Sequence, residues 1–422
     1  MKEDFLHYVW LNKKLDLLNL KTVSGEKIEI IHSGNFLQQA GPDFFNAQIV
    51  IGNQKWAGNI EIHLKSSDWY AHHHEKDEAY NNVILHVVWQ HDTPIYRKDN
   101  SEIPVLELQH FVSKNLVNNY NNLAISKQWI YCENQIQTID NLVFNIWKEK
   151  LFLERLQRKA QFIFSLLEEI GNDWEAVLFL LLAKNFGLNT NGETFLQVVK
   201  SISFPIVRKE AVDEKLLEAL FFGQANMLPE THEDMYINDL KSWYEYLQVK
   251  YQITTKVYDK VQFFKHRPDN FPTIRLAQLA MLYHKQRNLF SQIIEANDLE
   301  KLTKIFTVSV SEYWKTHYNF DVKSSFKEKQ LSKSFIDLLV INTVIPIKFA
   351  YANSQGKETI EELITLVSDI PAEKNTIIDK FKLIGLPSQS AFDTQSLLQL
   401  KNEYCNQKKC LQCSIGLQLL KN

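Results

Sequence analysis

Four polar side chains, Asp43, Glu61, His63 and Lys65, occupy positions that a strand hairpin would bring together. Residues 59–65 alternate between polar and apolar types, so Glu61, His63 and Lys65 share one face of a predicted strand. Asp43 follows a Gly-Pro turn signal and precedes an apolar run. If the two runs pair as a hairpin, the two carboxylates reach the same end of the sheet. Carboxylates placed in this way form a site for Mg²⁺ or Mn²⁺ of the kind used in phosphodiester cleavage.

A run of histidines offers a second chemistry. Six of the 13 histidines fall within 29 residues, and three of them are adjacent, at positions 72–74. His73 or His74 could share a helix face with Asp77 and, together with His63, bind zinc. Alternatively, the run contacts a phosphate backbone or completes the cation site. Three adjacent histidines cannot all point inward, so at least one is expected to be a solvated turn residue.

The elements that must position these residues follow from periodicity and turn signals. A helix is predicted first, then three strands, a short helix and a further strand, and the last two form a crossover packed on the sheet. His86 lies in a continuous apolar run typical of a strand buried on both faces, and it is expected to be a core histidine. The predicted ranges are 4–20 for the helix, 27–32, 47–51 and 59–65 for the strands, 75–82 for the short helix, 83–89 for the buried strand, and 105–108 for an edge strand.

This order of elements and motifs resembles the PD-(D/E)XK nuclease superfamily. That family places an Asp after a proline turn and a Glu-x-Lys on the following strand. The resemblance implies a restriction-endonuclease-like mixed sheet flanked by helices, in which Asp43 and Glu61 bind the divalent metal. His63 stands at the lysine position, so it is the candidate to activate water or bind phosphate. Lys65 would assist, although its Cα is about 13 Å along the strand from that of Glu61.

Three longer segments carry a resemblance to a bacterial family. G-P-D-F-F-N-A, G-N-I-E-I-H-L-K-S-S-D-W and A-Y-N-N-V-I-L-H-V-V are together similar to domain of unknown function 2851, found largely in Bacteroidetes. The resemblance spans the whole chain, and that family brings no established activity with it.

The chain is long enough for more than one domain. It has 422 residues, of which 45% are hydrophobic, which is ample for a sizeable core. We predict a nuclease-like α/β domain over residues 1–125 and an α-helical domain over residues 126–422. Helical periodicity dominates the second part, over residues 142–170, 174–186, 216–222, 235–252, 274–296, 334–350, 360–370 and 372–383.

All four cysteines are candidate ligands of a second metal site. Cys405, Cys410 and Cys413 fall in one C-terminal segment with the spacing C-x4-C-x2-C, and Cys132 is the one possible fourth ligand. A reducing compartment makes disulfides unexpected. Thiolates suit zinc or an iron–sulfur cluster, and both alternatives stay open.

Net charge and the search for targeting signals bear on where the protein is located and what it can bind. The N-terminus lacks a signal-peptide pattern, and no run reaches about 18 uncharged apolar residues, so a cytoplasmic protein without a membrane partner is expected. A net charge of −3 provides no overall cationic field, so DNA or RNA would need a local patch. Two candidates are a basic stripe (Lys148, Arg155, Arg158, Lys159) and a loop over residues 264–275. The stripe could equally be a solvated helix face, and the loop a rigid turn.

These observations favour a divalent-metal-dependent nuclease. Its rival is a non-catalytic module on a degenerate nuclease fold, which binds nucleic acid or a protein and carries a structural zinc or iron–sulfur site. A third alternative is a histidine-zinc hydrolase acting on a small molecule. His63 at the lysine position favours the non-catalytic module, whereas the co-occurrence of Asp43, Glu61 and Lys65 favours the enzyme.

Overall fold

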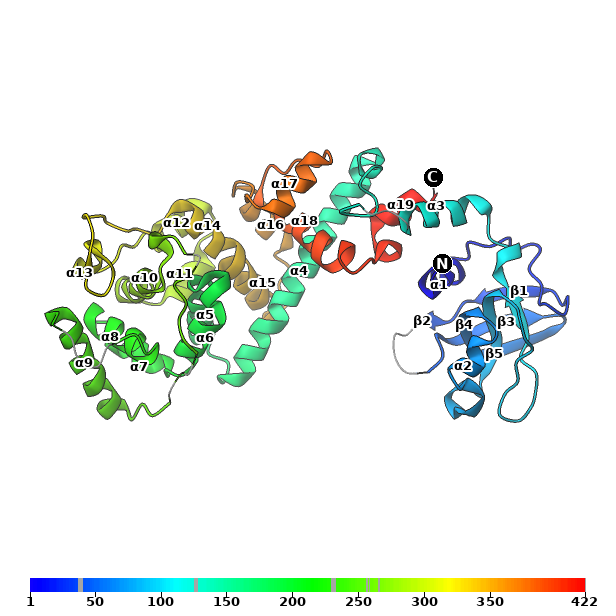
Figure 1. Ribbon diagram of the computed structural model, residues 1–422, viewed down its shortest axis with the longest axis horizontal. Coiled ribbons are helices and arrows are strands. Elements are labelled where there is room, and N and C mark those ends of the chain that lie inside the picture. The colour runs from blue at the N-terminus through cyan, green and yellow to red at the C-terminus, as the bar shows by residue number, and fades with distance from the viewer. Residues whose placement is uncertain are drawn as a thin grey trace. The chain divides into compact units, whose positions relative to one another are not determined.

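The computed structural model describes residues 1–36, 41–124, 128–228, 233–255, 257, 259–264 and 266–421. Its contacts divide the chain into two compact units (Figure 1). The first comprises residues 1–147, 383–386 and 400–422, and the second comprises residues 148–382 and 387–399. The C-terminal segment therefore belongs with the N-terminal residues, whereas the sequence-based division drew a single boundary at residue 125.

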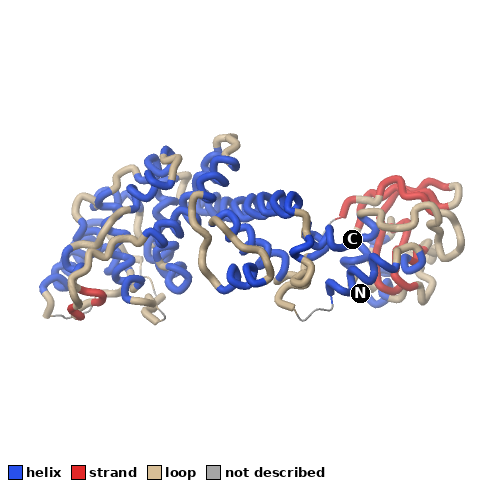
Figure 2. The backbone as a smooth tube through the Cα atoms, turned by 90° about the horizontal axis from the view of Figure 1, so that it is seen from above, coloured by secondary structure: helices blue, strands red, loops and turns tan. Residues whose placement is uncertain are grey.

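A six-stranded mixed sheet forms the centre of the first unit, and Figure 2 shows its strands gathered together in red. The strand order is β1-β3-β4-β5-β6, and β2 pairs with β3. The β1–β3 and β3–β4 pairs are antiparallel, whereas the β4–β5 and β5–β6 pairs are parallel. The strands are β1 (Ile28–His32), β2 (Asn35–Phe36), β3 (Phe44–Ile51), β4 (Gln54–Lys65), β5 (Val83–Gln90) and β6 (Val105–Glu107).

Short helices flank this sheet. Both α1 (Glu3–Leu11) and α2 (Asp68–Ala71) contact β4. The helix predicted over residues 4–20 ends at Leu11, because Lys13 adopts a left-handed conformation with φ 49°. The helix predicted over residues 75–82 is instead a pair of 3₁₀ turns. The remaining elements of the unit are η1 (His74–Lys76), η2 (Glu78–Tyr80), η3 (Leu108–His110), α3 (Lys114–Ala124), η4 (Ile136–Thr138), η7 (Leu400–Cys405), η8 (Cys410–Gln412) and α19 (Ser414–Lys421).

The strand β5 lies in the parallel part of the sheet and is buried along most of its length. Every residue from Val83 to Val88 is buried, as expected for a strand covered on both faces. Its parallel neighbour β4 approaches closely at Gly58, where a Cβ would overlap the Ile84 side chain and the carbonyl oxygen of Asn82. The predicted mixed sheet flanked by helices is thus confirmed at this level.

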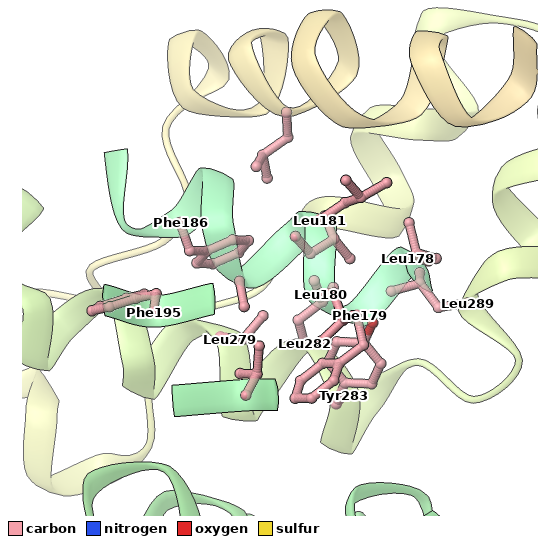
Figure 3. Close-up of a cluster of buried hydrophobic side chains, with 14 of the residues drawn as sticks. Leu178, Phe179, Leu180, Leu181, Phe186, Phe195, Leu279, Leu282, Tyr283 and Leu289 are labelled. Carbon is pink, nitrogen blue, oxygen red and sulfur yellow. The ribbon is translucent and has the colours of Figure 1, made fainter. Parts of the chain in front are cut away.

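The second unit is largely helical, as predicted. Its core surrounds α5, whose residues 176–183 and 186 are all buried. A helix that is apolar all round belongs inside a helical assembly, and Figure 3 shows Phe179 of α5 packed near Leu282 and Tyr283 of α10. The helices are α4 (Asn141–Glu169, continuing from the first unit), α5 (Trp174–Phe186), α6 (Leu188–Lys200), α7 (Phe204–Glu210), α8 (Glu214–Gln224), α9 (Met235–Tyr251), η5 (Pro268–Asn270), α10 (Pro272–Lys285), α11 (Leu289–Glu295), α12 (Leu299–Phe306), α13 (Glu312–Lys315), α14 (Lys333–Leu339), η6 (Val340–Val344), α15 (Ile345–Ser354), α16 (Ile360–Ser368), α17 (Thr376–Leu383) and α18 (Ala391–Gln399).

Two features depart from a purely α-helical prediction. A small hairpin forms from β7 (His317–Asn319) and β8 (Val322–Lys323). The segment η6 is a π-helix that precedes Pro346, and a proline cannot donate to the carbonyl four residues earlier. That carbonyl, on Asn342, accepts from the Lys159 ammonium at 3.5 Å instead.

One helical stretch, Lys333–Ser354, is long and apolar enough to cross a membrane by length and composition alone. Within it, 67% of the most apolar window is buried inside the structure. Core helices of soluble proteins pass the same test, and the packing of this stretch against α5 and α16 accounts for its apolar composition.

Candidate metal centre

A β-bulge places Asp43 beside Glu61. Phe44 pairs with Ile60 and Ala47 pairs with Gly58, so β3 carries one more residue than β4 between these pairs. Asn46 is in the left-handed region with φ 56°, and such bulges re-aim the residues next to them. As a result, the backbone N–H of Asp43 donates to Oε2 of Glu61 at 3.1 Å.

Asp43 is fixed by two further contacts. Its Oδ2 accepts the backbone N–H of Ile62 at 3.0 Å and lies 3.1 Å from Nε2 of His7 on α1. Burial lowers the pKa of His7, but the contact with Asp43 and the negative charges of Asp43, Glu3 and Asp4 together raise it overall. The carboxylate therefore lies between a strand backbone and the imidazole of His7.

Two histidines lie beside the other oxygen of Glu61, and a third contacts one of them. Oε1 lies 3.4 Å from Nε2 of His63 and 3.3 Å from Nε2 of His74. Nδ1 of His72 lies 3.1 Å from Nε2 of His63, and the donor atoms of these three histidines all lie within 4.8 Å of one another. These three imidazoles are therefore close enough to be candidate ligands of one cation, and Glu61 lies beside two of them.

Neighbouring side chains hold these imidazoles in place. Nδ1 of His63 lies 2.8 Å from Nε2 of His86 on the adjacent strand, and His86 is fully buried. The ring of Tyr80 stacks on His74 with centroids 3.8 Å apart, while Trp69 meets both His74 and His86 edge-on or tilted. Support of this kind orients a metal-binding histidine and fixes its tautomer.

Burial sets the charge of the cluster. The side chains of Glu61 and His63 are only 6% and 3% exposed. Burial, followed by the nearby Asp43, holds the pKa of Glu61 well above its usual range. Burial and the neighbouring histidines lower the pKa of His63 to about 3, and burial also lowers that of His74. Neutral imidazoles beside a protonated carboxyl are ready to accept a cation in exchange for one proton.

Comparison with known proteins gives one match. Residues 3–376 match the model of a family described as a protein of unknown function, DUF2851. The chain belongs to the DUF2851 family. No curated protein and no solved structure matches it. The matched residues of this DUF2851 chain include Asp43, Glu61 and the histidines described above, whereas Cys405, Cys410 and Cys413 lie beyond the matched range.

Several side chains considered in the sequence analysis lie outside the cluster. Lys65 is exposed at the end of β4, and within the described part of the chain no contact joins its ammonium to Glu61 or His63. Asp77 caps the 3₁₀ helix η2 by accepting the N–H of Ala79 at 2.9 Å. His73 is exposed in a left-handed turn with φ 61°. Of the three adjacent histidines, His72 and His74 reach the cluster and His73 does not.

The four cysteines of this family member come together in the first unit. Cys132, Cys405, Cys410 and Cys413 are free thiols that line one small cavity of about 20 Å³. Cys405 ends the π-helix η7, Cys410 begins η8, and Cys413 follows η8 directly. Within the described residues, nothing links this cavity to the histidine cluster through a shared side chain, so the two groups are separate candidate sites.

The basic side chains of the stripe on α4 contact polar side chains of other helices in the second unit. Lys148 pairs with Asp393 at 2.8 Å, Arg158 donates to Gln399 at 3.0 Å, and Lys159 donates to Asn342 at 2.8 Å. Arg155 also contacts Asn342, at 3.4 Å. These contacts join the stripe to other helices of the unit, while Arg158 remains an exposed residue.

The proline-rich loop at residues 264–275 is partly structural. Arg275 is buried, and its guanidinium lies over the Phe335 ring at 3.5 Å. Asp269 pairs with Lys327 at 2.8 Å. Phe264 is 74% exposed, and Lys265 lies outside the described residues. The buried cation favours the rigid-turn interpretation for the second half of the loop.

Sequence reasoning missed two members of the centre. His7 reaches Asp43 only through tertiary packing, and its position on an N-terminal helix carries no local signal for that contact. His86 was expected to be a core histidine, and it is buried as expected, but its partner is His63. In the β4–β5 register Glu61 pairs with His86, and paired residues lie on the same face of a sheet. His86 therefore lies on the face that carries Glu61 and His63, but the sequence does not reveal this register.

Proposed function

We propose that this protein is a divalent-metal-dependent hydrolase of phosphodiesters in nucleic acids. The observation that carries the proposal is the convergence of Glu61 with His63, His72 and His74, beside an Asp43 that is tied to Glu61 through its own N–H. Carboxylate and imidazole donors gathered from a hairpin and from the crossover segment that follows it form a site with no evident structural need for so many polar groups.

The donor set supports a particular class of metal. Three imidazoles with one carboxylate suit Zn²⁺ or Mn²⁺ better than Mg²⁺, which prefers oxygen ligands throughout. Glu61 Oε1, His63 Nε2, His72 Nδ1 and His74 Nε2 would hold the ion. A bound divalent cation supplies Lewis acidity toward water and toward a phosphoryl oxygen.

The remaining residues position these groups. The N–H of Asp43 occupies Oε2 of Glu61, which leaves Oε1 free to face the histidines. His63 offers the lone pair of Nε2 only when its proton is on Nδ1, where Nε2 of His86 is the acceptor at 2.8 Å. Asp43, held by His7, supplies a second negative charge at the edge of the site and is the candidate to accept a proton from water.

The order of strands in the first unit supports a nucleic-acid phosphodiester as the substrate. Three antiparallel strands are followed by a crossover turn and a parallel strand, with Asp43 directly before β3 and Glu61 on β4 at the open end of their hairpin. This resembles the core of restriction-endonuclease-like nucleases, in which the corresponding Asp and Glu bind the catalytic cation. His72 is exposed, so a polymer could approach the cluster from that side.

The test is cleavage of labelled single- and double-stranded DNA and RNA by the full chain with Mn²⁺, Zn²⁺ or Mg²⁺. The Glu61→Gln variant keeps an oxygen that can accept the Asp43 N–H but removes the charge, so cleavage should fall by at least about 10²-fold. His73→Asn is the matched control, because His73 is an exposed neighbour in a left-handed turn that Asn tolerates. Equal cleavage by Glu61→Gln and wild type would remove the proposal.

The exposed position of Lys65 favours a second candidate function, a non-catalytic binding module. Nucleases of this type use a lysine near the cation, and Lys65 does not reach the cluster. A non-catalytic module, in which the metal stabilises a surface that binds nucleic acid, would therefore show metal binding and nucleic-acid binding with no cleavage under any of the three ions. That combination of results would replace the hydrolase by the binding module.

A further inference from the structure

Four thiols from two distant parts of the chain meet at one cavity. Cys132 lies in the turn between α3 and η4, and the other three lie within the segment from η7 to α19. The cavity is small, and its other lining residues are mostly large or apolar: Tyr131, Leu400, Tyr404, Lys409, Ile415 and Gly416. All four cysteines of the chain line this cavity, so the group was not selected from a larger number of cysteines.

The four thiols are shielded from solvent. Cys413 is buried, and Cys132, Cys405 and Cys410 are partly buried around the cavity. Thiolates are the preferred ligands of zinc and of iron–sulfur clusters, and a cation bound by several sulfurs allows them to be deprotonated inside a protein.

The surroundings are built for sulfur ligands. Backbone N–H groups of Gly416 and Ile415 hydrogen-bond to the Cys413 sulfur, and such bonds stabilise a coordinated thiolate. Gly416 is required for this loop, since a Cβ there would overlap the carbonyl oxygen of Cys410.

We propose that Cys132, Cys405, Cys410 and Cys413 bind a thiophilic metal centre, either one zinc ion or an iron–sulfur cluster, that anchors the C-terminal segment to the N-terminal unit. The site is separate from the histidine cluster and does not rest on the proposed hydrolase activity. Four thiolates are a complete ligand set for either centre, so its role is structural rather than catalytic.

The anchored segment supports the helix that carries His7. The helix η8, which begins at Cys410, contacts α1, and α19 contacts α3. Tyr120 of α3 stacks on Phe5 of α1 with ring centroids 4.3 Å apart. The thiolate centre therefore holds together the elements on which the His7–Asp43 contact depends.

The experiment uses the full chain purified without oxygen, analysed for zinc, iron and acid-labile sulfide and by absorption spectroscopy. About one zinc per chain identifies the single ion, whereas iron with sulfide and visible absorption identifies the cluster. Cys410→Ser should lose most of this metal and expose residues 400–421 to limited proteolysis. Gln412→Ala, an exposed change within the same loop, should retain both metal and protease resistance.

A second variant separates this site from the histidine cluster. Glu61→Gln should keep the thiolate-bound metal, so metal lost from Glu61→Gln but retained in Cys410→Ser would overturn the proposal. If Cys410→Ser does not fold, titration of wild-type thiols with a mercurial reagent provides the test. Release of the metal in step with the modification of four thiols supports the site, whereas a wild-type chain without zinc or iron, unable to bind Co²⁺ with thiolate charge-transfer bands, contradicts it.

Discussion

The backbone N–H of Asp43 donates to Oε2 of Glu61 across 3.1 Å, so the two carboxylates of the candidate centre are connected through the main chain and not through a shared proton. The connection exists because the bulge at Asn46 turns the start of β3 toward β4. In return, Oδ2 of Asp43 accepts the N–H of Ile62, which is a buried residue of β4. Asp43 thus has a structural role as well as a charge.

These two roles of Asp43 can be separated by substitution. Asp43→Asn keeps an oxygen for the Ile62 N–H, so its stability should stay within about 1 kcal/mol of wild type. Asp43→Ala leaves that N–H without its partner and should cost about 1–3 kcal/mol. Both variants remove the negative charge and should weaken Mn²⁺ or Zn²⁺ binding. Urea unfolding and calorimetric metal titration measure the two effects, and equal stability of the Asn and Ala variants would contradict the structural role.

A second prediction concerns His86, which contacts His63 but no proposed donor atom. His86→Leu removes the acceptor for the His63 Nδ1 proton and should lower metal affinity about 10- to 100-fold, as is typical for residues that orient a ligand. His86→Gln offers an amide oxygen to the same proton and should restore part of that affinity. Metal titration of both variants tests this, with thermal unfolding to establish that each is folded. A Gln variant as weak as the Leu variant would count against an orienting role.

How much of this centre could be predicted depended on the range of the interactions. Alternation along β4 and the Gly-Pro-Asp turn predicted that Asp43, Glu61 and His63 lie near one another, because a hairpin is a local structure. The same alternation put Lys65 on their face but could not show that the strand carries it out to solvent. The contact of His7 with Asp43 depends on how α1 packs on the sheet, and no spacing in the sequence encodes that.

The helical unit shows the same limit. Periodicity predicted α5 with its observed bounds, because an uninterrupted apolar segment leaves few alternatives. It predicted one continuous helix over residues 334–350, where the structure inserts a π-helix before Pro346. The basic stripe on α4 had helical spacing, but its partners Asn342, Asp393 and Gln399 come from segments about 180 to 250 residues away. Composition alone could not distinguish this internal network from a surface for phosphates.

The position of Lys159 in that network leads to a third prediction. Burial lowers the pKa of Lys159 well below its usual value, and its ammonium is bonded to Asn342. Lys159→Met removes a charge that is costly to bury but also leaves the Asn342 carbonyl without its donor, so these effects should offset each other and stability should stay within about 1 kcal/mol of wild type. Nucleic-acid binding, measured by fluorescence anisotropy, should not change. Lys150→Met, at an exposed position of the same helix, is the control, and selective loss of binding in Lys159→Met would show that the stripe contacts nucleic acid.

The last prediction concerns Glu218, a fully buried carboxyl of α8 in the helical unit. Its oxygens contact the hydroxyls of Tyr236 and Ser311, the latter at 2.8 Å. Burial nevertheless raises the pKa of Glu218 to about 7, from an ordinary value of 4.5. Between these two pH values the folded chain keeps a proton that the unfolded chain releases.

Stability must therefore fall as the pH rises from about 4.5 to 7, by roughly 3 kcal/mol from this group, and then level off. Glu218→Gln cannot ionise and should lack this contribution, so its stability relative to wild type should improve by about that amount between pH 4 and pH 8. Urea unfolding across this range measures the difference. Glu245→Gln, an exposed carboxyl on α9, should follow the wild-type curve, and a Glu218→Gln curve parallel to wild type would mean that Glu218 is already ionised in the folded chain at low pH.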